Sequence, residues 1–259
     1  MRRFARRLGL PMSLSAGVFL LMEAQNAGAE SPQAGQNPAG TSAQHSAQHS
    51  AQKEVEPTTP PLSLSASLAG LKGQGALYAQ LAFSSEGKPL GSVLCELFPD
   101  KAPQAVAAFV GLARGLVAWK DPHSKTWVKK PLYDGLLVHR TVADVLIQAG
   151  DPKCFGDALC MFAPGTGEPG FVLPDEIHPE HRFEAGGSLA MASRGLGTAG
   201  SQFFVTLKPT TWLAGKHTVF GTCDGLPLLG TLSRKDTDKN DQPKTPLSLS
   251  RVTFFRKNK

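Results

Sequence analysis

The stretch from Tyr133 to Pro152, YDGLLVHRTVADVLIQAGDP, contains two short strand-like runs, Leu136–Val138 and Val145–Gln148. Both runs are too short for a typical helix, and Gly residues lie close to each, which favours short β-strands. Further runs of this kind occur at 187–192, 202–207, 217–222 and 251–255. Many short strands separated by Gly and Pro are typical of a closed antiparallel barrel, so the chain is predicted to be mainly β.

A β-hairpin is predicted upstream of this stretch. Residues 76–83 and 92–98 are rich in strand-forming residues, and the segment 84–88, SSEGK, supplies a turn between them. Along the second run, Val93, Cys95 and Leu97 occupy alternate positions. One face of this strand must therefore point into a core.

A helix is predicted after the hairpin. Asp100 offers an N-cap, Pro103 suits the first turn, and apolar residues follow at helical spacing up to Leu112, before Gly115 ends the run. A second helix is much harder to place. The sequence thus predicts many strands with one or two helices.

The charge of the chain gives little indication of a polyanionic partner. The 259 residues carry 27 Lys and Arg against 21 Asp and Glu, a formal charge of +6, and 41% of the residues are apolar. This composition excludes a disordered or collagen-like protein. Four arginines and one acid lie in the first 29 residues, which leaves +3 for the remainder. We therefore expect no binding to nucleic acid.

The first 29 residues have the three parts of a secretory signal peptide. A basic stretch, Met1–Arg7, precedes an apolar stretch, Leu8–Met22, and the small residues Ala27-Gly28-Ala29 follow. The apolar stretch is shorter than the ~20 residues that span a bilayer. We expect residues 1–29 to be cleaved, leaving no membrane span and a periplasmic or secreted protein. An uncleaved anchor and a mitochondrial transit peptide are the alternatives.

Residues 30–63 are predicted to be a disordered linker. Pro, Gly, Ser, Ala and Gln dominate this region, and the segment 42–45, SAQH, is repeated at 46–49. Such a segment cannot bury enough apolar surface to offset its ordering entropy. One folded domain is predicted over residues 64–259.

Three stretches of the domain carry a family resemblance. The first is YDGLLVHR at 133–140, continued by IQAGDP at 147–152; the second joins AMA at 190–192 to GSQFFV at 200–205; the third is WLAGKHTVFG at 212–221. In order and spacing they resemble the signatures of the cyclophilins, and the similarity runs from about Ala76 to Phe255. The resemblance implies a closed eight-stranded antiparallel β-barrel capped by two α-helices, and peptidyl-prolyl cis-trans isomerase activity.

Arg140 is the candidate catalytic residue. Rotation about an X–Pro bond breaks no covalent bond but must cross a barrier of roughly 20 kcal/mol, because it disrupts amide resonance. In the twisted transition state the nitrogen lone pair localises, so a donor aimed at this nitrogen favours the transition state over the ground state. A guanidinium suits this role because it stays charged and presents several donors in a rigid fork. Gln148 and Gln202 are expected to hold Arg140 and the substrate backbone.

The resemblance also implies a substrate-binding set. The residues expected to line a pocket for the proline ring are Val145, Leu146, Met191, Phe204, Leu213 and His217, and those expected along the peptide are Ala192, Ser193 and Gln202. Trp212 stands where the family donates an indole hydrogen bond to cyclosporin, which implies sensitivity to cyclosporin-like inhibitors. A Trp at such a junction also often only covers core.

Several positions depart from the family pattern; Ala143-Asp144, for example, stands where cyclophilins usually have Pro-Gly. Val145 stands where cyclophilins usually have Phe, which is expected to loosen the grip on proline, and Ser193 stands where they usually have Asn. We expect an isomerase that acts as a monomer on proline-containing polypeptides and assists the folding of exported proteins. The Val145 change motivates the alternative, a cyclophilin-fold binding module for Pro-containing segments with little or no turnover.

The cysteines are expected to be structural. In an oxidising compartment Cys154 and Cys160 are expected to form a disulfide, whereas Cys95 and Cys223 are expected to be buried thiols, with a second bridge left open. Their spacing does not fit a structural zinc site, so no metal is predicted. The segment 165–170, GTGEPG, matches a dinucleotide-binding fingerprint but lacks the required βαβ context, so no cofactor is predicted.

Overall fold

The fold is described from a computed structural model, which describes residues 62–155, 160 and 163–258. The predicted signal peptide and nearly all of the predicted linker lie outside these residues, and both stay predictions. Within the described ranges, no helix has the length and apolarity needed to cross a membrane.

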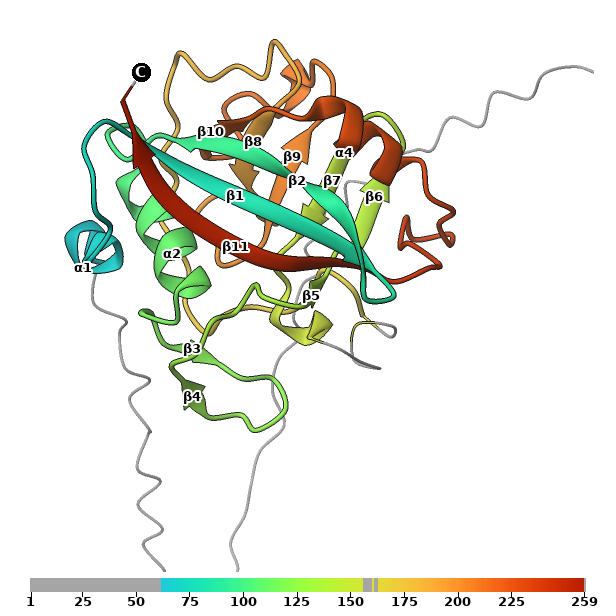
Figure 1. Cartoon of the computed structure of the whole chain (residues 1–259), viewed down its shortest axis with the longest axis horizontal. Coiled ribbons are helices and arrows are strands. Elements are labelled where there is room, and N and C mark those ends of the chain that lie inside the picture. The colour runs from blue at the N-terminus through green and yellow to red at the C-terminus, as the bar shows by residue number, and fades with distance from the viewer. Residues whose placement is uncertain (1–61, 156–159, 161–162, 259) are drawn as a thin grey trace, which may run out of the picture. The chain divides into compact units, whose positions relative to one another are not determined.

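The described residues are mainly β (Figure 1). The strands are β1 (Ala76–Ser85), β2 (Lys88–Leu97), β3 (Trp119–Lys120), β4 (Trp127–Val128), β5 (Leu136–Leu137), β6 (Arg140–Val142), β7 (Leu146–Ala149), β8 (Ser188–Met191), β9 (Phe203–Thr206), β10 (Val219–Cys223) and β11 (Leu247–Lys257). The helices are α1 (Leu64–Leu68), α2 (Pro103–Ala113) and α4 (Leu226–Ser233), with short 3-10 helices η1 (Pro152–Cys154) and η2 (Thr211–Leu213).

Nine of these strands form one antiparallel sheet, in the order β5-β11-β1-β2-β10-β8-β9-β7-β6. The two edge strands, β5 and β6, are consecutive in the chain and only residues 138–139 separate them. So short a connection can join the two edges only if the sheet curls round on itself. The predicted barrel had eight strands and was closed, whereas this sheet has nine, and no ladder joins β5 to β6 in the described part of the chain.

Helices cover both ends of the curled sheet, with α2 at one end and α4 at the other (Figure 1). The predicted helix after Asp100 is confirmed as α2, but Asp100 is not its N-cap. Instead, the backbone N–H groups of Gln104 and Ala105 each donate to the carboxylate of Glu176 at 2.9 Å. A side chain distant in sequence thus satisfies donors that the first turn of a helix leaves unpaired.

The predicted hairpin is confirmed by the pairing of β1 with β2. Its turn consists of Glu86 and Gly87, both with positive φ, at 51° and 76°. Positive φ at both central residues gives a turn whose twist matches that of the flanking strands. This match allows two strands of ten residues each to pair along most of their length.

The core is built around Phe109, which α2 inserts into the curled sheet. Its ring lies 5.2 Å from the rings of Phe203 and Phe220 and 5.3 Å from that of Tyr133. These rings come from β9, β10 and the segment before β5. Helix α2 therefore plugs one end of the barrel-like sheet with an aromatic side chain.

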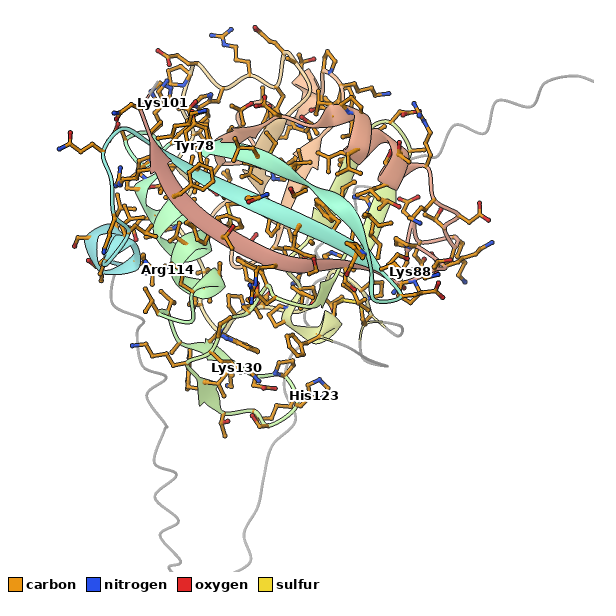
Figure 2. All side chains as sticks on the ribbon, in the orientation of Figure 1. Tyr78, Lys88, Lys101, Arg114, His123 and Lys130 are labelled. Atoms are coloured by element: carbon orange, nitrogen blue, oxygen red, sulfur yellow. A yellow bond between two sulfur atoms is a disulfide. The ribbon has the colours of Figure 1, made fainter. Side chains whose placement is uncertain are left out.

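Two features of the outer surface were not predicted. Helix α1 is held by Arg114, whose guanidinium donates to the carbonyls of Ser67 and Ala69 at 2.6 and 2.8 Å (Figure 2). The short hairpin of β3 and β4 places Lys130 over the ring of Trp119, 5.2 Å from its centroid (Figure 2). Both features depend on contacts between segments that are separate in sequence.

The structure contains two disulfides. Cys154 is bonded to Cys160, and Cys95 is bonded to Cys223. The second bond corrects the expectation of two buried thiols. Cys95 and Cys223 lie directly opposite each other on the neighbouring strands β2 and β10, a juxtaposition that results from sheet register rather than from sequence spacing.

Candidate active site

Four adjacent strands bring the main site residues into one row. Arg140 of β6 lies opposite Gln148 of β7, Gln148 lies opposite Phe204 of β9, and Phe204 lies opposite Ala190 of β8. Residues directly opposite in neighbouring antiparallel strands share a face of the sheet. The alternate residues Thr141 and Ile147 are buried on the other face. Arg140 therefore lies on the same face as an aromatic ring two strands away.

The apolar part of this face is separate from the main core. Phe204 packs with Phe183, Ala190 and Val219, whereas its neighbour Phe203 belongs to the main core. The partly buried side chains packed against this second cluster include Leu146, Ala192 and Leu213. The ring of His217 meets that of Phe204 edge to face, with 5.3 Å between centroids. The face thus combines an apolar surface with a cationic neighbour.

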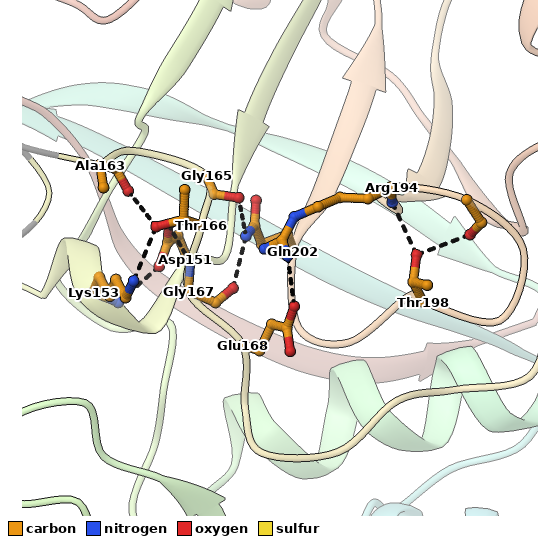
Figure 3. A network of polar contacts seen from close by, with 11 residues as sticks. Asp151, Lys153, Ala163, Gly165, Thr166, Gly167, Glu168, Arg194, Thr198 and Gln202 are labelled. Atoms are coloured by element: carbon orange, nitrogen blue, oxygen red, sulfur yellow. Dashed lines mark hydrogen bonds and ion pairs between the residues drawn. The ribbon is translucent and has the colours of Figure 1, made fainter. Parts of the chain in front are cut away.

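A small cavity of about 60 Å³ adjoins the row. Its walls come from Gln148, from the loop 165–169, from 192–194 and from 198–202. The guanidinium of Arg194 pairs with the carboxylate of Glu168 at 2.8 Å, joining two walls of the cavity (Figure 3). A volume of this size holds a few water molecules or a small side chain.

Gln202 is locked into the loop that forms one wall of this cavity (Figure 3). Its Nε2 donates to the carbonyls of Gly165 and Gly167 at 3.0 and 2.8 Å. The N–H of Gly167 donates to the buried carboxylate of Asp151 at 3.0 Å. The loop conformation is therefore fixed by hydrogen bonds that the buried Gln202 side chain donates and by one that the buried carboxylate of Asp151 accepts.

The two glutamines do not hold Arg140 as the sequence predicted. Nε2 of Gln148 donates to Oε1 of Gln202 at 3.1 Å, so the amides bind each other. The two hydrogen bonds that the side-chain amide of Gln202 donates both go to the loop carbonyls. Although Gln148 lies directly across from Arg140, no hydrogen bond joins their side chains in the described residues.

The side chain that binds Arg140 is that of Asp241, a residue that lies in no motif. Nε and Nη2 of Arg140 donate to Oδ2 of Asp241 at 3.3 and 3.2 Å. Asp241 lies in the loop between α4 and β11 and reaches β6 only through the curvature of the sheet. Periodicity and motif spacing carry no signal for such a contact.

The comparison with protein families agrees with this geometry. A family model described as "Cyclophilin type peptidyl-prolyl cis-trans isomerase/CLD" matches residues 80–254, well over half of the chain. The chain belongs to the cyclophilin family. Its activity is accordingly the cis-trans isomerisation of peptidyl-prolyl bonds, and its substrates are proline-containing polypeptides.

Curated cyclophilin relatives cover most of the domain. "Peptidyl-prolyl cis-trans isomerase B" of Streptomyces anulatus is 44% identical over 135 residues, which are 52% of this chain and 72% of the relative. "Peptidyl-prolyl cis-trans isomerase A" of Mycobacterium tuberculosis is 37% identical over 167 residues, 63% of this chain and 87% of the relative. A crystal structure of a cyclophilin type peptidyl-prolyl cis-trans isomerase from Cryptosporidium parvum superimposes with a TM-score of 0.56 at 25% identity, covering 70% of this chain and 99% of that one.

The histidines of this cyclophilin site are poor candidates for proton transfer. His139 is 2% exposed, and neither of its ring nitrogens has a hydrogen-bond partner in the described residues. The pKa of His139 is lowered to about 4, mainly by burial; the charge of Arg140 acts in the same direction, whereas Asp151 and Gln202 act against it. Burial also lowers the pKa of His217. Both rings are therefore neutral at pH 7, and Arg140 is not flanked by a second cation from His139.

Met191 does not line the apolar face of the cyclophilin site, contrary to the prediction. It is 1% exposed and packs in the main core, because it lies opposite Phe203 on the interior face of the sheet. The contact of Met191 with the site is made by its backbone instead. Its carbonyl lies 3.2 Å from Nδ1 of His217, a ring that also lies 3.3 Å from the hydroxyl of Ser193.

Val145 and Trp212 lie at the margins of the site. Val145 is partly buried in the turn between β6 and β7 and is not a member of either apolar cluster. Trp212 belongs to η2, next to Leu213, and its side chain is 56% exposed. An indole this exposed is accessible to a ligand rather than serving to cover core.

Proposed function

We propose that Arg140 catalyses the isomerisation by donating a hydrogen bond to the prolyl nitrogen as the peptide bond twists. The apolar cluster around Phe204 would receive the proline ring while the guanidinium faces the nitrogen. The observation that carries this proposal is the row in which β6, β7 and β9 align Arg140, Gln148 and Phe204 on one face. No proton is transferred in this mechanism, which agrees with two neutral histidines at neutral pH.

The test is a protease-coupled assay on an X–Pro peptide. Arg140→Ala is expected to lower kcat/KM about a hundredfold, because one well-placed transition-state donor contributes about 3 kcal/mol. Peptide binding, followed by NMR titration, is expected to persist. Arg251→Ala, at an exposed position of β11, is the matched control and should retain full activity.

Two results would contradict the proposal. Full activity of Arg140→Ala would show that Arg140 is not the hydrogen-bond donor to the prolyl nitrogen. If the unmodified protein does not accelerate isomerisation, a binding module with little or no turnover is favoured. Val145→Phe also tests the binding-module alternative, because it restores the residue that cyclophilins usually have at this position. If the smaller side chain weakens the grip on proline, this variant will lower KM.

We also propose that the protein assists the folding of exported proteins in the periplasm or outside the cell. The support is the signal-like N-terminus together with two disulfides, which persist in oxidising compartments and are rare in the cytosol. Sequencing the N-terminus of the mature protein from separated cell fractions tests both points. A start at Glu30 in the exported fraction is expected; a start at Met1 in the cytosolic fraction would contradict the proposal.

Sensitivity to cyclosporin-like inhibitors is proposed from the exposed Trp212. Its indole N–H is expected to donate to the inhibitor, so Trp212→Ala should raise the inhibition constant at least about tenfold while leaving peptide turnover within a few-fold. Equal inhibition of both forms would contradict this role of the indole. The protein is proposed to act as a monomer, for which sedimentation velocity of the mature chain should show a single species of monomer mass.

A further inference from the structure

The guanidinium of Arg140 is fixed along one edge. Both of its contacts with Asp241, from Nε and from Nη2, go to the same oxygen, Oδ2. Nε and Nη2 form one edge of the planar fork, and the remaining nitrogen, Nη1, has no hydrogen-bond acceptor among the described residues. The carboxylate therefore occupies one edge and leaves another for a substrate.

Asp241 is itself anchored to the strand that carries Arg140. Its backbone carbonyl accepts a hydrogen bond of 2.8 Å from the N–H of Thr141, the next residue of β6. The main chain of Asp241 thus binds one residue of β6 while its side chain binds the preceding one. Two contacts to consecutive residues fix both the place and the direction of the carboxylate.

The loop around Asp241 is preformed. The carboxylate of Asp238 accepts from the N–H groups of Asn240 and Gln242 at 2.8 and 3.0 Å, and these bonds lower the pKa of Asp238. The residues Thr237 and Pro243 pair as a β-bridge across the base of the loop. Asp241 adopts a left-handed backbone conformation, with φ of 62°, which Asp, Asn and Gly tolerate better than other residues.

We propose that Asp241 is a positioning residue for the isomerase reaction, which holds one edge of Arg140 so that Nη1 faces the prolyl nitrogen. This inference rests on the proposed role of Arg140. A free arginine side chain samples many rotamers, and the ion pair selects one before the substrate arrives. Both partners are partly exposed, at 33% for Arg140 and 44% for Asp241, and ion pairs in such positions add little to stability. Orientation is the function that this contact serves.

Two substitutions separate the carboxylate from the backbone of the loop. Asp241→Gly removes the side chain, Asp241→Asn keeps an oxygen acceptor without the charge, and both residues tolerate the positive φ. The bond from Thr141 to the backbone carbonyl survives in both. We expect Asp241→Gly to lower kcat about tenfold with KM within about twofold, because only the orientation of the donor is lost. Asp241→Asn should fall between this variant and the unmodified protein. Thermal unfolding checks that both variants fold.

Asp144 provides a matched control. It also has a positive φ, 57°, and its carboxylate pairs with an arginine, Arg234, at 2.8 Å. Its backbone N–H donates to Ser233, a bond that a glycine keeps. Asp144→Gly therefore makes the same chemical change without touching Arg140, and kcat should stay within about twofold of the unmodified protein.

A double-mutant cycle distinguishes positioning from a structural role. In an Arg140→Ala background, Asp241→Gly should cause no further loss of kcat, because the group that it orients is already absent. A further tenfold loss in that background, or full activity of the single Asp241→Gly variant, would overturn the inference. Full activity of Arg140→Ala would instead overturn the proposed function, so the two failures are distinguishable.

Discussion

At the scale of single residues, the protonation of His139 affects stability more than catalysis. Its ring is enclosed beside Asp151 and Gln202, and burial lowers its pKa from 6.5 to about 4. Between pH 6.5 and 4, His139 is therefore protonated in the unfolded chain but neutral in the folded protein. By linkage, the free energy of unfolding decreases as the pH falls through this window, by about 3 kcal/mol for this group.

His139→Gln tests this linkage. Without the imidazole, the decrease in the free energy of unfolding between pH 7 and pH 4 should be smaller by about 3 kcal/mol than in the unmodified protein. Urea denaturation at the two pH values measures this difference, and it does not depend on how much the substitution destabilises the protein at pH 7. Equal pH dependence of the two proteins would show that His139 titrates normally in the fold.

The position of each residue in the sequence explains which parts of the active site could be predicted from the sequence. Arg140, Phe204 and His217 lie in continuous motifs, so their resemblance to family signatures selects them directly. Gln148 and Gln202 were predicted to hold Arg140, but their amides bind each other, because hydrogen bonding between two amides depends on side-chain direction. Their predicted contact with the substrate backbone stays a prediction. Asp241 is in no motif, and only the structure joins it to Arg140.

At the scale of elements, α2 stabilises the sheet through one side chain. Phe109 is fully buried, and its ring contacts those of Phe203, Phe220 and Tyr133 from different segments. Phe109→Ala is expected to lower the free energy of unfolding by about 3–5 kcal/mol, since it removes apolar contacts and leaves a cavity. Chemical denaturation monitored by circular dichroism measures the loss.

Phe255→Ala is the control for this prediction. Phe255 is 37% exposed on β11, and among the described residues its ring stacks only on Tyr78, at 5.7 Å between ring centroids. Its removal leaves no internal cavity, so a loss of about 1 kcal/mol is expected. Equal losses in the two variants would contradict the view that α2 plugs the barrel-like sheet with Phe109.

At the scale of the whole molecule, the two disulfides constrain the unfolded chain to different degrees. The Cys95–Cys223 bond closes a loop of 128 residues, whereas the Cys154–Cys160 bond closes one of 6. The chain-entropy relation assigns about 5 kcal/mol to the first bond and about 2 kcal/mol to the second. The long-range bond is therefore expected to contribute most of the stability that oxidation provides.

Two double variants measure this ranking. Cys95→Ala with Cys223→Ala should destabilise the protein by about 2–3 kcal/mol more than Cys154→Ala with Cys160→Ala, as judged by urea denaturation without reductant. Equal destabilisation, or the reverse order, would mean that native contacts around the bonds outweigh the entropy of the closed loops. Turnover of the peptide should persist in the first double variant below its unfolding transition.

The sequence by itself determined the mainly β class, the first hairpin, α2 and the family to which the chain belongs. These features depend on residues that are close in sequence: alternating apolar residues, helical spacing, turn residues and contiguous motifs. Such patterns can be read from the sequence without knowing the fold. The tertiary structure alone decided the ninth strand, the Cys95–Cys223 bond, the burial of Met191 in the core and the pairing of Asp241 with Arg140. Each of these depends on which strand lies next to which and on the register between them. That register is set by the packing of the curled sheet as a whole, so no local stretch of sequence encodes it.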